Sequence, residues 1–173
     1  MIKLHILEIA TGLEAHAVRY AAEHWGISVT VTWVGNSQQI VDCLSSCPDC
    51  DLILISGHGD ERGLILPELA EEVSSNYPYR DVISHDDFAK FLNLNHSVVI
   101  NSSCMGGVQS MAEVFLDKGA KCYIAPKDFP LADASLMYLL KFLYEYVKNN
   151  KDIDKAHDLA LPQDERELFT LFK

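Results

Sequence analysis

The sequence predicts an α/β fold of three layers, in which a mostly parallel central sheet carries helices on both faces. Apolar runs alternate with helical patterns along all 173 residues, and such alternation implies right-handed crossovers between parallel strands. The run at 51–56 is almost continuously apolar, which is typical of a parallel strand buried on both faces. At this length we expect a single domain spanning 1–173.

The first part of the chain predicts three strands and two helices. Residues 14–25 place Ala15, Val18, Ala21 and Ala22 on one helical face, and Gly26 marks the end of that helix. The β-branched run at 28–34 favours a strand, and Ser37 is expected to cap the helix after it. The elements expected, in order, are a strand at 3–9, a helix at 14–25, a strand at 28–34, a helix at 37–44 and a strand at 51–56.

The second part begins with an irregular connection and then returns to alternation. Gly63, Pro67 and Pro78 interrupt the segment that follows the third strand, where only one extended piece, at 63–66, is expected. The elements expected after it are a helix at 86–92, a strand at 97–101, a helix at 108–118, a strand at 121–125 and helices at 132–149 and 151–161.

Composition excludes several classes of partner. The formal net charge is −11, which argues against nucleic acid because phosphate binding needs clusters of Lys and Arg. No apolar run reaches the roughly 20 residues of a membrane span, and the first residues lack the pattern of a signal peptide. We therefore expect a cytoplasmic protein that binds neither membranes nor nucleic acid. The acidic charge favours neutral or cationic partners.

Two short motifs carry the chemistry of this chain. Ser-Gly-His-Gly at 56–59 follows one buried strand, and Ser-Ser-Cys-Met-Gly-Gly at 102–107 follows another. If these strands are neighbours in a parallel sheet, His58 and Cys104 emerge at its carboxyl edge, where ligands bind in open α/β sheets. A cysteine attacks as its thiolate, and a nearby histidine can take the thiol proton. His58 and Cys104 are thus the candidate base and nucleophile.

The glycines of both motifs suit the same chemistry. Gly59 leaves its backbone N–H open to a substrate oxygen, so the N–H groups of Gly59 and Cys104 are the candidate oxyanion hole. Gly106 and Gly107 are expected to let the chain turn tightly after the cysteine. The helix expected at 108–118 places a helix N-terminus close to Cys104, where a negative charge is favoured.

These motifs, in this order and 46 residues apart from His58 to Cys104, resemble the caspase-like cysteine peptidases. That superfamily includes caspases, metacaspases, gingipains, separases and CHAT-type domains. The wider sequence pattern is closest to that of CHAT-type domains, on the basis of Asp86-Asp87-Phe88, Asp133-Ala134 and residues 156–160. The resemblance covers about 50–160. It implies a caspase-like fold in a flavodoxin-like arrangement. It also implies an endopeptidase that cleaves a protein or peptide through a His58–Cys104 dyad, without metal or cofactor.

The resemblance leaves the specificity of the enzyme open. In these relatives the position two before the nucleophile lines the pocket for the substrate's P1 side chain, and Ser102 occupies it here without a charge. Asp133 is a candidate for a carboxylate in that pocket, the alternative being that it caps the helix it opens. The sequence also leaves open whether an activating partner or a homodimer is needed.

Other functions remain as alternatives. One is a catalytically silent member of the same fold that binds a protein partner. Another is a flavodoxin-like or receiver-like domain or a different hydrolase, although a receiver needs an Asp at a strand end where this chain has His58 and Cys104. Cys43, Cys47 and Cys50 are interpreted as thiols of a connecting loop, with zinc binding or a redox role as the alternatives.

Overall fold

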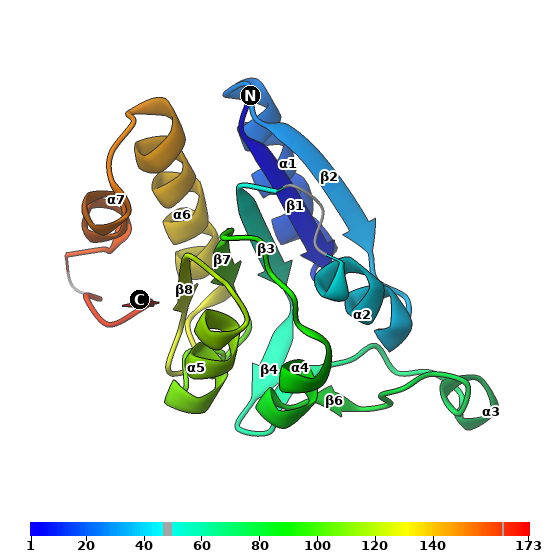
Figure 1. Ribbon diagram of the computed structural model, residues 1–173. Coiled ribbons are helices and arrows are strands. Elements are labelled where there is room, and N and C mark those ends of the chain that lie inside the picture. Colours follow the sequence, from blue (N-terminus) through cyan, green and yellow to red (C-terminus); the bar gives the residue numbers. More distant parts are fainter. Residues whose placement is uncertain (47–49, 164) are drawn as a thin grey trace.

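A six-stranded sheet runs through the middle of the computed structural model, which describes residues 1–46, 50–163 and 165–173. Its strand order is β2-β1-β3-β7-β8-β9, with every pair parallel except β8 and β9 (Figure 1). The central pair, β3 and β7, aligns Ile55 with Asn101. The predicted mostly parallel α/β sheet is therefore confirmed. Its strands are β1 (Lys3–Glu8), β2 (Ser28–Trp33), β3 (Leu52–Ser56), β7 (Val98–Asn101), β8 (Cys122–Ala125) and β9 (Thr170–Phe172).

Helices cover both faces of the sheet and divide the core in two. Leu54 and Ile100 pack under α1 (Gly12–His24), α6 (Ala132–Leu143) and α7 (Ile153–Ala160). Ile55 and Val99 pack on the opposite face under α2 (Ser37–Ser45), α4 (His85–Phe91) and α5 (Gln109–Asp117). Alternate residues of each buried strand thus serve different cores, as the pleat requires. Within the described ranges, no helix has the length and apolarity needed to cross a membrane.

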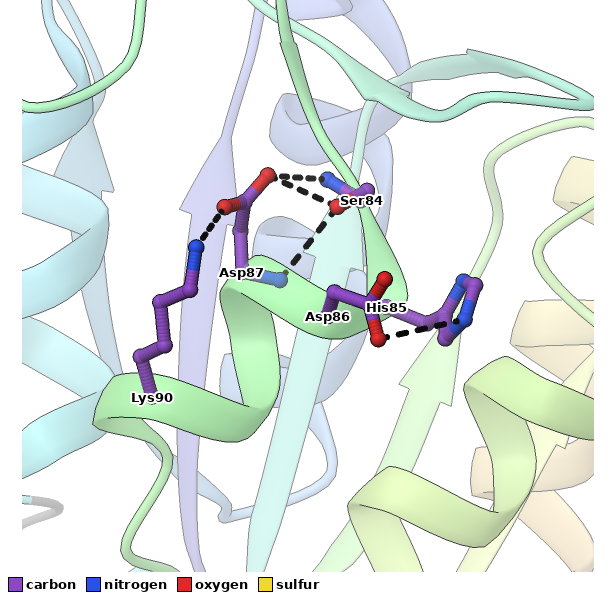
Figure 2. Close-up of polar contacts among 5 residues, drawn as sticks. All are labelled: Ser84, His85, Asp86, Asp87 and Lys90. Atoms are coloured by element: carbon purple, nitrogen blue, oxygen red, sulfur yellow. Dashed lines mark hydrogen bonds and ion pairs between the residues drawn. The ribbon is translucent and has the colours of Figure 1, made fainter.

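Short polar motifs begin two helices of the second face. Figure 2 shows Ser84 accepting a hydrogen bond from the Asp87 backbone N–H at 3.3 Å, while Asp87 Oδ2 accepts from the Ser84 N–H at 3.2 Å. This reciprocal capping box starts α4. At α2 the cap is Asn36, whose side chain accepts from the Gln39 N–H, so the prediction that Ser37 caps this helix was wrong by one residue. Ser37 is the first helical residue and donates its hydroxyl to the carbonyl oxygen of Tyr79 at 2.7 Å.

A small second sheet lies where the sequence predicted only one extended piece. It contains three antiparallel strands: β4 (His58–Asp60), β5 (Gly63–Ile65) and β6 (Val82–Ile83). β4 is the next element after β3 in the chain, and the short helix α3 (Glu71–Ser74) lies between β5 and β6. Strands of two or three residues are too short to show a period in the sequence, so pattern analysis missed β4 and β6. The sheet begins at His58, which it holds in an extended backbone.

The C-terminal part departs from prediction in two places. The helix expected over 132–149 is α-helical only to Leu143 and continues as a π-helix, η1, over Tyr144–Lys148. There Glu145 turns inward with 6% of its surface exposed, and its carboxylate accepts hydrogen bonds from Lys141 and Asn149. β9, which the sequence did not predict, adds an antiparallel edge that aligns Leu171 with Ile124.

Two histidines, one buried and one half-buried, are held by hydrogen bonds to hydroxyl groups. His5 on β1 is 6% exposed and shares a 2.8 Å hydrogen bond with the Thr32 hydroxyl. His157 on α7 bonds the Tyr138 hydroxyl through Nδ1 at 2.6 Å. Burial lowers the pKa of both imidazoles below their ordinary value of 6.5. Both are therefore neutral in the folded protein at neutral pH.

We predict that the free energy of unfolding falls as the pH drops below about 6.5. In that range the unfolded chain takes up protons on these histidines that the folded chain does not bind, so acid favours unfolding. Urea titrations at pH 7.5, 6.5 and 5.5 measure the slope. His5→Gln should flatten it, with His24→Gln at an exposed position of α1 as the matched control. A His5→Gln slope equal to that of the wild type would contradict this assignment.

Candidate active site

The two sequence motifs lie in direct contact at the carboxyl edge of β3 and β7. A Cβ atom placed on Gly59 would lie 2.4 Å from the Cys104 carbonyl oxygen and 3.1 Å from the Ser103 Cβ. No side chain fits in that space, so only glycine allows the β4 backbone to approach the Cys104 loop this closely. Because β3 and β7 are adjacent and parallel, residues remote in sequence meet here.

His58 occupies the first position of β4, opposite Ile65. Its side chain is exposed, and in the described part of the chain it makes no hydrogen bond or ion pair. The imidazole is thus accessible to solvent and to a ligand. Nothing in the described residues fixes its tautomer, so any orientation of the ring for catalysis would depend on the bound substrate.

Cys104 lies half-buried in the loop between β7 and α5, with a free thiol. Burial raises the pKa of this thiol above its ordinary value; its own backbone N–H acts against that shift, and the negative charge of Asp128 adds to it. The sulfur is therefore protonated at neutral pH. A nearby base, rather than the local field, has to generate the thiolate.

A buried network fixes the shape of the Cys104 loop. Asn101 Oδ1 accepts hydrogen bonds from the Ser103 N–H at 3.0 Å and from the Ser103 hydroxyl at 2.7 Å. Asn101 Nδ2 donates to the Tyr123 hydroxyl at 2.9 Å, and that hydroxyl donates to the Gly106 carbonyl oxygen at 2.8 Å. Burial raises the pKa of Tyr123, so the phenol stays protonated and available as the donor.

The tight turn covers 104–107 and includes both glycines, as expected, but its left-handed residue is Met105. Met105 has a φ of 57°, in the left-handed region, while neither Gly106 nor Gly107 has a positive φ. The glycines are needed for a different reason. A Cβ on Gly106 would lie 2.7 Å from Asn101 Nδ2, and one on Gly107 would lie 2.6 Å from the Ala125 carbonyl oxygen. They allow close packing of the loop on β7 and β8.

The two candidate pocket residues have different surroundings. Ser102 is 8% exposed, and its hydroxyl donates to Glu14 Oε1 at 2.7 Å. Asp133 is exposed in the first turn of α6, whose N-cap is Leu131, so the alternative interpretation of Asp133 as the N-cap was wrong. Sequence reasoning did not select Glu14, although its place in the first turn after β1 puts it at the same sheet edge.

A cavity of about 750 Å³ opens beside the Cys104 loop. It lies between the segment that follows β8 and the segment that leads into β9, and the Met105 N–H donates to the carbonyl oxygen of Asp128 in its wall at 3.1 Å. Asp128 was not singled out from the sequence, although it follows a strand end. The lining residues are Lys127, Asp128, Phe129, Pro130, Leu131, Glu165, Arg166, Glu167, Leu168 and Thr170.

No cluster of three or more His, Cys, Asp or Glu side chains within the described residues is arranged to hold a metal ion. Of the cysteine group near the end of α2, Cys47 lies outside the described residues. Cys43 is half-buried on α2, with its sulfur 3.5 Å from the Thr32 hydroxyl. These observations assign no chemistry to the group.

Comparison with known proteins gives a likeness in fold alone. No family model matches the chain, and no curated protein matches its sequence. The solved complex of the RgpB pro- and mature domains from Porphyromonas gingivalis is similar, with a TM-score of 0.56 and 12% identity. That match covers 99% of this chain but only 46% of the RgpB chain. A Francisella response regulator receiver domain, 1452, matches with a TM-score of 0.43 and 15% identity over 87% of this chain and 100% of that domain. The likeness to RgpB shows a three-layer α/β fold consistent with the caspase-like arrangement.

Proposed function

We propose that this protein is a cysteine endopeptidase in which His58 is the general base and Cys104 the nucleophile. The observation that carries the proposal is the contact between Gly59 and the Cys104 backbone, which holds the two motifs together at one sheet edge. The fold is similar to that of the RgpB pro- and mature domains, and the two sequence motifs resemble those of the caspase-like cysteine peptidases. This chain spans less than half of the RgpB chain, so the likeness supports the fold and not the substrate.

The reaction follows from the two side chains. His58 takes the proton of the Cys104 thiol, and the sulfur attacks the carbonyl carbon of the scissile peptide bond. The C–N bond then breaks as the imidazolium gives its proton to the leaving amine. The acyl group stays on the Cys104 sulfur as a thioester. A water molecule, deprotonated by His58, attacks the thioester and releases the new carboxylic acid, and the proton returns to the sulfur. Protons and electron pairs balance without a cofactor.

Backbone N–H groups would stabilise the negative oxygen of each tetrahedral intermediate. In the described part of the chain, the Cys104 N–H donates to no backbone carbonyl; it interacts with its own sulfur and would turn to the oxyanion once the sulfur is acylated. The Gly59 N–H lies on the strand that contacts Cys104. A donor of this kind is worth about 10²–10³ in kcat in related chemistry.

In this proposal, the substrate residues that flank the scissile bond bind in the cavity beside the Cys104 loop. Phe129 and Leu131 in its wall are 60% and 75% exposed, so they offer apolar surface to a bound peptide. Asp128 links this wall to the nucleophile loop through the Met105 N–H. These exposed apolar side chains support a protein or peptide chain as the proposed substrate class.

One observation favours a second candidate, a catalytically silent module of the same fold that binds a protein partner. Burial raises the pKa of the Cys104 thiol, and exposed His58 has no hydrogen-bonding partner in the described residues to orient it. A module that only binds has no need of a reactive thiol. Thiol reactivity therefore separates the two functions.

We predict covalent labelling of Cys104 by peptidyl acyloxymethyl ketones, offered with Arg, Lys, Asp, Asn or Leu at P1 and read by intact mass. Cys104→Ala should abolish both labelling and peptide cleavage. Cys43→Ala, which removes another half-buried thiol, is the matched control and should retain both. Cleavage that survives in Cys104→Ala would refute the proposed nucleophile, and an unlabelled wild type would favour the silent module.

Gly59→Ala should lower kcat/KM by roughly 10²-fold or more. The new Cβ would lie 2.4 Å from the Cys104 carbonyl oxygen, which is too close, so the Cys104 backbone would have to move. Gly12→Ala is the matched control, since a Cβ at Gly12 meets nothing within 4 Å. Steady-state kinetics on the best peptide substrate give the comparison. Equal kinetics for the two alanine variants would mean that the Gly59 contact does not set the site.

Asp128→Asn should lower the pKa of the Cys104 thiol and speed its reaction with iodoacetamide at pH 7. The variant removes the negative charge that disfavours the thiolate, so the curve of alkylation rate against pH should move to lower pH. Asp133→Asn removes an exposed charge from α6 and serves as the control. The assignment fails if the two asparagine variants give the same curve.

A further inference from the structure

One carboxylate joins the two strand ends that carry the proposed dyad. Ser56 lies two residues before His58, and Ser102 lies two residues before Cys104. Both serine hydroxyls donate to the same atom, Glu14 Oε1, at 2.6 Å and 2.7 Å. Glu14 belongs to the first turn of α1, so it reaches across the ends of β3 and β7 from a third element.

The connection continues to the end of β1. Because Ser56 commits its one hydroxyl proton to the carboxylate, Thr11 is the donor in the 2.5 Å contact between the Thr11 and Ser56 hydroxyls. The Thr11 backbone N–H in turn donates to Glu8 Oε1 at 2.6 Å. Ser56 is fully buried, and Glu8 and Ser102 are each 8% exposed. Glu14 and Thr11 are half-buried, so the chain of bonds is partly shielded from water, which strengthens hydrogen bonds.

These bonds act where the sheet no longer sets the geometry. The β3–β7 pairing ends at Ile55 and Asn101, and its last bond runs from the Ser102 N–H to the Ile55 carbonyl oxygen at 2.9 Å. Beyond that point β3 leads into β4 and β7 leads into the Cys104 loop. The bonds through Glu14 connect these two segments on the α1 face of the sheet, beside a longer 3.4 Å bond from the Ser102 hydroxyl to the Ile55 carbonyl oxygen.

We propose that Glu14 is a positioning residue that sets the separation and alignment of His58 and Cys104. The inference rests on the proposed function, because the dyad is the pair whose geometry it sets. Reacting groups held in the right geometry account for a large part of enzymatic rates, and a displacement of about 1 Å can cost roughly 10²-fold. A carboxylate that binds both segments through one oxygen limits their relative movement.

The closing experiment compares Glu14→Gln, Glu14→Ala and Glu23→Ala. The Gln side chain keeps an oxygen that can accept both serine hydroxyls but removes the charge, whereas Ala removes both bonds. Glu23→Ala removes an exposed carboxylate from the same helix, where it pairs with Arg19, and is the matched control. Kinetics on the best peptide substrate are measured well below each variant's melting temperature, so that rates refer to folded protein.

Glu14→Ala should lower kcat at least about tenfold and leave KM within about twofold, and Glu14→Gln should restore most of kcat. A role in stability alone would lower the melting temperature but not kcat per folded molecule, so an unchanged kcat overturns the proposal. A Gln variant as slow as Ala also overturns it, because charge rather than position would then matter. If Glu14→Ala does not fold, Ser56→Ala, which removes one of the two bonds, takes its place with the same expectation.

A second measurement separates this inference from the proposed function. The rate of Cys104 alkylation by iodoacetamide against pH is recorded for the wild type, His58→Ala and Glu14→Ala, whether or not a peptide is cleaved. If His58→Ala changes the profile and Glu14→Ala changes it in the same way, positioning holds even for a protein without peptidase activity. If only His58→Ala changes it, the dyad stands and Glu14 is not its positioning residue. If His58→Ala leaves the profile unchanged, His58 and Cys104 are not coupled, and both proposals fall.

Discussion

The parallel, in-register pairing of β3 with β7 is the constraint on which the core and the candidate site both depend. These strands lie at the centre of the sheet, and alternate residues of each enter opposite hydrophobic cores. A slip of one residue would exchange the faces of every side chain on the strand, so burial fixes the register. Parallel direction then sends both strand ends to one edge, where Gly59 meets the Cys104 backbone. The packing of the core thus determines the geometry of the candidate site.

The Cys104 loop is held from both faces of this sheet. On the α5 face, Asn101 and Tyr123 bind its backbone through buried hydrogen bonds. On the α1 face, the Ser102 hydroxyl binds Glu14. A buried polar group that loses its partner costs about 1–3 kcal/mol, so each network favours one loop conformation over its competitors. Met105 is kept in the left-handed region between these anchors.

The electrostatics of the nucleophile bear on how the proposed enzyme would be controlled. Burial and the Asp128 charge both favour the neutral thiol, so the proposed mechanism requires the proton to move to His58 when a substrate is bound. A peptide bound across Cys104 and His58 would exclude water from the exposed imidazole and order its ring. In this view catalysis depends on the substrate completing the site, which is consistent with a thiol that stays unreactive until then.

The sequence by itself determined the fold class and the ends of the strands that carry His58 and Cys104, because long apolar runs and the glycines around these residues are local signals. It did not predict β4, β6 or β9, since strands of two or three residues have no visible period. Nor could it select Glu14, which lies 88 residues from Ser102 along the chain, or Asp128, whose charge acts on Cys104 through space. It placed a turn at Gly106 and Gly107 correctly but did not identify Met105 as the left-handed residue of that turn. Only the tertiary structure decided these features, because they depend on which segments pack against one another rather than on the residues next to them in the chain.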